Sequence, residues 1–203
     1  DTMQMATAMR TYTKAGASVV DKGNPGKAIK SAEAKVAAVY EAPYLSHAPL
    51  EPQNAIASVT GSRCEIWAPT QSPTITQAFV SEAIGIDFDD VKVHVLTAGG
   101  GFGRRAIADV CAEAAVLSKR VKRPVKVIWT RESDMTQAYY RPVFAVHATG
   151  GVTQGKIAGA QIHCISQSIP LSSGTLFAAA LSGLPGPIRG RVIDAALAIF
   201  STN

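Results

Sequence analysis

The sequence is poor in the residues that build metal clusters, and the few that it has are dispersed. Its three cysteines, Cys64, Cys111 and Cys164, form no C-x-x-C pair. Iron–sulfur clusters and structural zinc sites need closely spaced thiolates, so neither is predicted. The histidines form no metal set either, because His163 and Cys164 are strand neighbours that would point to opposite faces. We therefore predict no metal ligand in the chain, and we expect three reduced cysteines buried in apolar packing.

The sequence also lacks a long hydrophobic run. No stretch approaches the roughly 18 apolar residues that a membrane-spanning helix needs, so none is predicted. The chain begins at Asp1 without a charged-then-apolar leader, and residues 192–200 read as the start of an apolar element whose partner is missing. We interpret the chain as a piece of a longer protein, with exposed apolar surface expected around residues 176–184 and 192–200.

Charged residues make up only 17% of the chain and hydrophobic residues 47%, which is enough for a substantial core. The net charge of +5 raises nucleic acid as a partner, but the basic residues are scattered apart from residues 119–123 and 104–105. The first cluster lies at a predicted helix end, where cations suit the helix dipole. We therefore expect a solvated helix end and no nucleic-acid partner.

One segment is rich in glycine: residues 97–105 read T-A-G-G-G-F-G-R-R. They follow a predicted strand at residues 91–96 and precede a predicted helix from about Ala106 to Arg120. Glycines let successive backbone N–H groups converge on a ligand, and a helix start adds unpaired N–H groups. Arg104 and Arg105 would oppose the helix dipole at a cost of up to about 1 kcal/mol each, so we expect a negative group beside them.

This loop admits more than one interpretation. The simplest is a strand-to-helix connection with two solvated arginines. A dinucleotide fingerprint needs G-x-G-x-x-G, but Arg104 stands where the third glycine should be. A P-loop needs a lysine followed by serine or threonine, and both are missing.

A family pattern fits the loop better. The run G-G-G-F-G resembles the glycine motif of the molybdopterin-binding large subunit of the xanthine oxidase and aldehyde oxidase family, and the R-R ending resembles its isoquinoline 1-oxidoreductase beta-subunit type. Other segments match the family in the expected order. They are residues 44–52 (Y-L-S-H-A-P-L-E-P), 67–73 (W-A-P-T-Q-S-P), 123–127 (R-P-V-K-V), 131–135 (R-E-S-D-M) and 140–142 (Y-R-P).

The resemblance implies a molybdopterin-type molybdenum cofactor, in its cytosine dinucleotide form in some members. It places Gly100, Gly101, Phe102 and Gly103 beside the metal and its dithiolene, with Phe102 helping to wall the site. It also matches Gln71 to the glutamine whose side-chain N–H donates to the metal-bound oxo group. A neutral amide donor suits that task.

The chain departs from the family where other members have a glycine and a lysine followed by an active-site glutamate. Here Arg104, Arg105 and Ala106 stand in those places. Because Ala106 has no carboxylate, the chain cannot orient a purine substrate through that position. The planar guanidinium of Arg104 would instead favour anionic, carbonyl or aromatic substrates. The family's general-base segment, G-x-G-E, has no match. The chain is therefore expected to carry part of a site and to bind no cofactor tightly alone.

The activity that the resemblance implies is insertion of a water-derived oxygen into a C–H bond of an N-heteroaromatic compound or an aldehyde. The implied partners are the remainder of the same large subunit, a small two-cluster [2Fe–2S] subunit and a small aromatic or aldehyde substrate. A periplasmic or membrane-associated bacterial location is the family expectation. Two other classes stay open: a non-catalytic scaffold or assembly fragment, and a nucleotide- or anion-binding module that uses the same loop.

The predicted fold class is α+β, because strands outnumber helices and occur in consecutive runs. Strands are predicted at residues 35–44, 55–67 (with a hairpin at 60–62), 91–96, 125–129, 143–149 and 157–166, with a turn at Gly150–Gly151 and a helix from Pro73 that ends at Gly85. The predicted divisions are an N-terminal extension (1–30), a partial cofactor-binding domain (31–170) and a Gly/Pro-rich loop with a tail (171–203).

Overall fold

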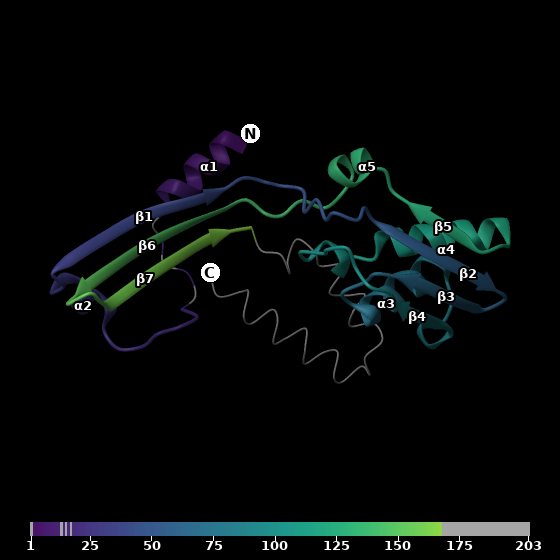
Figure 1. Ribbon diagram of the computed structural model, residues 1–203, viewed down its shortest axis with the longest axis horizontal. Coiled ribbons are helices and arrows are strands. Elements are labelled where there is room, and N and C mark those ends of the chain that lie inside the picture. The colour runs from purple at the N-terminus through teal and green to yellow at the C-terminus, as the bar shows by residue number, and fades with distance from the viewer. Residues whose placement is uncertain (1, 13, 15, 17, 168–203) are drawn as a thin grey trace. The chain divides into compact units, whose positions relative to one another are not determined.

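The computed structural model describes residues 2–12, 14, 16 and 18–167. They form two compact units, one made of residues 2–45 and 142–167, the other of Ser46–Arg141. Each unit combines a β-sheet with helices (Figure 1), which confirms the predicted α+β class. No helix among the described residues is long and apolar enough to cross a membrane. The three predicted divisions of the chain stay predictions, and the last of them lies outside the described residues.

The first unit is built on an antiparallel sheet of three long strands in the order β1-β6-β7. The strands are β1 (Ala34–Ala42), β6 (Phe144–Thr153) and β7 (Lys156–Ser166). Two helices, α1 (Thr2–Thr11) and α2 (Pro25–Lys30), lie on one face of this sheet. The Asn24 side chain caps α2 by accepting the Lys27 N–H at 2.9 Å.

The predicted turn at Gly150–Gly151 is wrong. Both glycines lie inside β6, and the chain reverses at Gln154–Gly155, where both residues have positive φ. Gly151 is needed for packing, because a Cβ there would lie 2.7 Å from the Ala32 Cβ and 2.9 Å from the Ile29 Cα. Glycine is favoured both where a helix packs closely against a strand and in a tight turn. A pair of glycines in the sequence therefore does not distinguish the two.

The other face of this sheet is apolar, and no helix or strand among the described residues packs against it. Paired positions across the three strands place Val36, Tyr40, Val146, Ile162 and Cys164 on this face. Tyr40 is 62% exposed and Ile162 is 68% exposed. The prediction that Cys164 is buried is therefore wrong, because its strand packs against helices only through the opposite face.

The second unit contains a four-stranded sheet in the order β4-β3-β2-β5. Its strands are β2 (Asn54–Thr60), β3 (Arg63–Ala68), β4 (Val91–Val95) and β5 (Val125–Ile128). β2 and β3 form the predicted hairpin, whereas β3 and β4 run parallel and are joined through α3 (Pro73–Ile84) and a 3₁₀ turn, η1 (Phe88–Asp90). α3 ends as predicted at Gly85, which has φ 63°.

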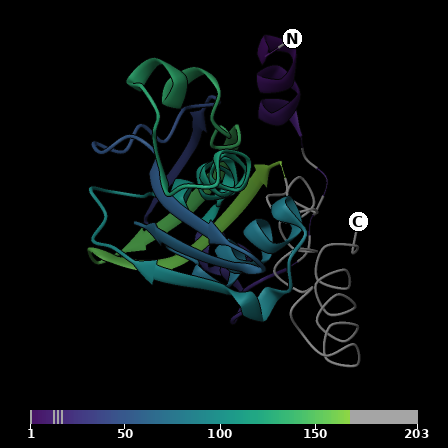
Figure 2. The same cartoon turned by 90° about the vertical axis from the view of Figure 1, so that its right-hand side faces the viewer.

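The core of the second unit lies between one face of its sheet and the helices α3 and α4 (Asp109–Val121) (Figures 1 and 2). Alternate residues of β2 and β3, such as Ala57 and Ile66, are fully buried there. Cys64 and Cys111 belong to this core, so the prediction that they are buried is confirmed. The short helix α5 (Arg131–Thr136) follows β5. The parallel pair β3 and β4 positions the candidate site.

Candidate functional site

The glycine loop and Gln71 meet at one edge of the second sheet. β3 and β4 are parallel neighbours, with Ala68 beside Val95, so the segments that leave their carboxyl ends start side by side. The Gly103 N–H donates to Gln71 Oε1 at 3.1 Å, and the Gln71 N–H donates to the Arg105 carbonyl at 3.1 Å. The structure therefore brings together residues that lie about 30 positions apart and that the sequence had linked only by family resemblance.

The loop backbone depends on its glycines. Gly100 and Gly103 both have φ 93°, a conformation that other residues rarely adopt. A Cβ on Gly101 would lie 2.6 Å from Gln71 Oε1, so only glycine lets that side chain approach. Phe102 has φ 54° although it is not glycine, and 74% of it is exposed. Such a left-handed aromatic residue at a loop tip is a feature of functional sites.

The loop has three N–H groups that donate to no other residue in the part of the chain that the structure describes; they belong to residues 100–102. The flanking donors are used, since the Gly99 N–H binds Glu51 Oε2 at 2.8 Å and the Gly103 N–H binds Gln71. Three successive unused donors on an open loop suit an electron-rich ligand.

Arg105 is anchored inside the protein and is only 3% exposed. Its guanidinium donates to the Gly100 carbonyl at 2.7 Å, to the Glu51 carbonyl at 2.6 Å and to Glu51 Oε2 at 3.0 Å. Burial opposes the ionisation of Glu51, but hydrogen bonds from the Gly99 N–H and Asn54 and the charge of Arg105 outweigh it and hold the Glu51 pKa below its usual range.

Arg104 is fully buried and forms a two-pronged ion pair with Asp109, at 3.0 and 2.7 Å. Its guanidinium also lies 5.4 Å from the Trp129 ring centre and 6.0 Å from that of Tyr139. The expected negative groups beside the two arginines are therefore Asp109 and Glu51. The interpretation with two solvated arginines is wrong.

The predicted helix start at Ala106 is also wrong. Arg104–Ala106 form a 3₁₀ turn, η2, and Ile107 is extended, so α4 begins only at Asp109. The cause is the ion pair, because Asp109 occupies the first turn of α4, where a carboxylate suits the dipole, and it holds Arg104 outside the helix. The unused N–H groups of the loop are thus separate from the helix start.

Sequence reasoning missed several residues that support the site. Glu51 appeared only as part of a family segment, and its contacts with Gly99 and Arg105 carried no signal in the sequence. Asp109 was visible as an acidic residue five positions after Arg104. His47 also lies near Arg104, and its pKa is lowered chiefly by burial and also by that arginine. Among the described residues no three His, Cys, Asp or Glu side chains group as a metal site.

These residues fit one side of the site for the cofactor that the resemblance implies. The backbone N–H donors of residues 100–102 would face the cofactor, and the Gln71 side chain is arranged to add a fourth donor. Because Gln71 Oε1 accepts from Gly103, the amide nitrogen is the half of that side chain left to donate. Phe102 supplies an exposed aromatic surface beside them.

Comparison with known proteins gives a match over nearly the whole chain: residues 9–203 match the family model of the molybdopterin cofactor-binding domain. A nicotinate dehydrogenase subunit from Pseudomonas putida is 28% identical over 93% of this chain and 16% of that protein. The beta subunit of isoquinoline 1-oxidoreductase from Brevundimonas diminuta is 35% identical over 64% of this chain and 16% of that protein. The chain thus spans about a sixth of these relatives.

Solved structures show the same fold at lower identity. Quinoline 2-oxidoreductase from Pseudomonas putida 86 matches with a TM-score of 0.57 and 21% identity, over 70% of this chain and 18% of that one. The aldehyde oxidoreductase from Desulfovibrio gigas matches with a TM-score of 0.58 and 18% identity, over 71% of this chain and 16% of that one.

Proposed function

Because the chain belongs to the molybdopterin cofactor-binding domain family, we propose that it supplies the glycine-loop side of the cofactor site in the molybdenum-binding subunit of a hydroxylase or dehydrogenase. The proposed substrates are N-heteroaromatic compounds or aldehydes, with water as the oxygen source. When bound, the cofactor supplies the two-electron redox chemistry. The observation that carries the proposal is the row of three unused N–H donors at residues 100–102, beside Gln71.

In this proposal the loop binds and orients the cofactor through neutral donors. Gly100, Gly101 and Phe102 contribute backbone N–H groups, and Gly103 supports them by fixing the Gln71 amide. The amide nitrogen of Gln71 donates to the bound group. Donors that are already in place need no rearrangement when charge develops during the reaction, which is the basis of their contribution to rate.

Phe102 and Arg104 have different proposed roles. The exposed Phe102 ring walls the site and keeps water from it. Arg104 was expected to bind substrate through its guanidinium fork, but Asp109 occupies that fork. We propose instead that Arg104 positions the loop and contacts no substrate.

The rest of the site is proposed to come from outside this chain. The chain spans about 16% of its relatives' length, and no segment of it matches the family's general-base glutamate. The remainder of the large subunit would supply that residue and further cofactor contacts. A small subunit with two [2Fe–2S] clusters would receive the electrons. The cytosine dinucleotide form is the proposed cofactor variant.

Metal analysis of the intact protein, co-expressed with its small [2Fe–2S] partner, tests this function. About one molybdenum atom per large subunit is expected, together with an extractable pterin. Bound nucleotide without molybdenum would instead support an anion-binding module. Absence of both would support a scaffold role.

A further inference from the structure

We infer that the buried Arg105 and the partly exposed Glu51 form a clamp that turns the peptide planes of the glycine loop, so that the N–H groups of residues 100–102 face away from the protein interior. Arg105 and Glu51 are therefore positioning residues for the proposed cofactor site. The inference rests on the proposed function for the identity of the ligand, but not for the clamp itself.

The three carbonyls of residues 99–101 are each held by a donor from the protein. The Glu51 N–H binds the first at 3.1 Å, Arg105 Nε binds the second at 2.7 Å, and the Arg104 N–H binds the third at 2.8 Å. In a planar trans peptide the carbonyl and the following N–H point in opposite directions. Fixing these three carbonyls therefore fixes the N–H groups of residues 100–102 on the opposite side.

Two of these three carbonyl contacts depend on the clamp. Arg105 Nε holds the carbonyl of Gly100 directly, and its Nη2 holds the Glu51 carbonyl and carboxylate, with a further contact to the Pro52 carbonyl at 3.4 Å. Glu51 in turn contacts Gly99 twice, through its N–H and through Oε2. The loop is thus fastened at two consecutive residues by one ion pair.

The geometry needs an arginine. The guanidinium presents several donors in a rigid plane, so that Nε and Nη2 reach the Gly100 carbonyl and Glu51 at the same time. A lysine would carry the same charge on a single nitrogen and could not fix both. Burial makes the difference larger, because solvent cannot replace a lost partner of a side chain that is 3% exposed.

The clamp is tested by amide hydrogen exchange in the full-length protein prepared without cofactor, so that no ligand protects the loop. Arg105→Lys should accelerate exchange in the peptide covering residues 97–106 about tenfold or more at the hydrogen-bonded amides of residues 99, 103 and 104, because a charge-assisted hydrogen bond that holds the loop is lost. Peptides from β2 and β3 should exchange as in the unchanged protein. Arg63→Lys, at an exposed arginine of β3, is the matched control and should change neither.

Unchanged loop exchange in a folded Arg105→Lys protein would overturn the clamp. If the β2 and β3 peptides also exchange faster, that variant is misfolded and Glu51→Gln decides. In the Glu51→Gln variant, the new amide oxygen can still accept from the Gly99 N–H, but the ion pair with Arg105 is lost. Faster exchange confined to the loop then supports the clamp, and unchanged exchange overturns it.

The same variants in cofactor-loaded protein separate the clamp from the proposed function. Arg105→Lys should lower molybdenum content, whereas Arg63→Lys should not. If the unchanged protein holds no molybdenum, the proposed function fails while the exchange result still stands. If molybdenum is present and loop exchange is insensitive to Arg105, the clamp fails while the function stands.

Discussion

Arg104 and Arg105 are adjacent in the chain, yet they have different tasks. Arg104 pairs with Asp109 and lies near two aromatic rings, so it ties the loop to the start of α4. Arg105 pairs with Glu51 and holds the carbonyl of Gly100. Both arginines are buried, whereas the Asp109 and Glu51 side chains are 24% and 36% exposed, so removing either carboxylate should cost less than the roughly 3–5 kcal/mol measured when a fully buried pair is broken.

Changing Gln71 to Ala in the full-length protein should lower turnover more than it lowers molybdenum content. One neutral hydrogen bond to the bound group affects reactivity more than retention, and loss of such a donor costs on the order of 10²-fold in rate. Turnover per molybdenum atom is the measurement. Gln137→Ala, at an exposed glutamine, is the control. Normal turnover per metal atom, combined with loss of metal, would contradict the assigned role.

The three cysteines of the 203-residue chain should label at different rates. Burial raises the pKa of Cys64 to about 11 and that of Cys111 to about 12, so both stay protonated and covered in mildly alkaline buffer. Cys164 is exposed and should react alone with a thiol reagent. Mass spectrometry of the labelled peptides checks this, and Cys164→Ala should abolish the fast phase. Rapid labelling of Cys64 or Cys111 would refute it.

At the scale of the elements, α4 is joined to the sheet through one buried hydroxyl. Ser118 is fully buried in α4; it accepts the Val59 N–H of β2 at 3.0 Å and donates to the Arg123 carbonyl at 2.8 Å. The helix, the strand and the segment leading to β5 therefore share this side chain. Lys119 contributes a further link by donating to the Ile84 carbonyl at the end of α3.

Ser118→Ala should destabilise the second unit by about 1–3 kcal/mol, because the Val59 N–H and the Arg123 carbonyl lose a hydrogen-bond partner that is itself fully buried. Urea unfolding followed by the fluorescence of Trp67 and Trp129, at low protein concentration, is the measurement. Ser62→Ala, in the exposed turn between β2 and β3, should change stability by less than about 0.5 kcal/mol. Equal effects of the two substitutions would show that the buried hydroxyl has no special role.

The strands and the helix α3 could be predicted because their signals are local. Alternation of apolar residues gave the hairpin of β2 and β3, and Pro73 and Gly85 gave the ends of α3. The pattern of residues 2–12 did not reveal α1, and the start of α4 was placed too early. That boundary depends on the side-chain pair of Arg104 and Asp109, which no local propensity contains.

The candidate site was predictable only in part. The resemblance named Gln71 and the glycine loop, and the structure places them in hydrogen-bonding contact. The partners of the arginines depend on tertiary contacts, since Glu51 lies 54 positions before Arg105. Whether an arginine faces a ligand or an internal carboxylate cannot be read from its position beside a glycine motif.

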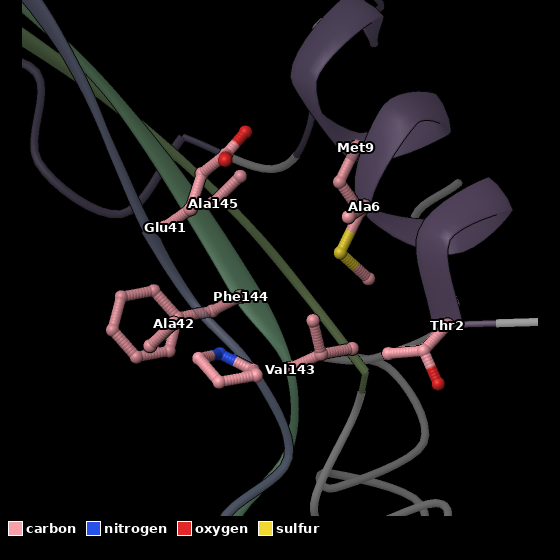
Figure 3. A pocket seen from close by; sticks show the side chains of 9 residues that line it. Thr2, Ala6, Met9, Glu41, Ala42, Val143, Phe144 and Ala145 are labelled. Atoms are coloured by element: carbon pink, nitrogen blue, oxygen red, sulfur yellow. The ribbon is translucent and has the colours of Figure 1, made fainter.

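At the scale of the whole molecule, the described residues leave apolar surface exposed on the sheet of β1, β6 and β7. The exposed apolar residues there include Val36, Tyr40 and Ile162. A groove of about 290 Å³ lies at the edge of the same unit, beside α1, and is lined by Met9, Val143 and other residues (Figure 3). The segments at 176–184 and 192–200, predicted to be exposed, lie outside the described residues.

The isolated chain should self-associate as its concentration rises, because exposed contiguous apolar surface favours association. Light scattering measures the mass of the particles in solution, and Ile162→Glu should lower that mass. Gln161→Glu, which adds the same charge on the opposite face of the strand, is the control. The isolated chain should also neither hold the cofactor tightly nor oxidise substrate. A monomeric chain with stoichiometric molybdenum and hydroxylase activity would contradict this prediction.

The two ion pairs also set how the loop attracts a ligand. Two cations and two carboxylates cancel, so Arg104 and Arg105 give the loop no net positive charge. Attraction must then come from oriented backbone dipoles, which act over a few ångströms and are little affected by salt. Cofactor retention by the full-length protein should accordingly change little between low and high ionic strength. A steep loss of molybdenum as salt rises would show that free cations, and not fixed dipoles, hold the ligand.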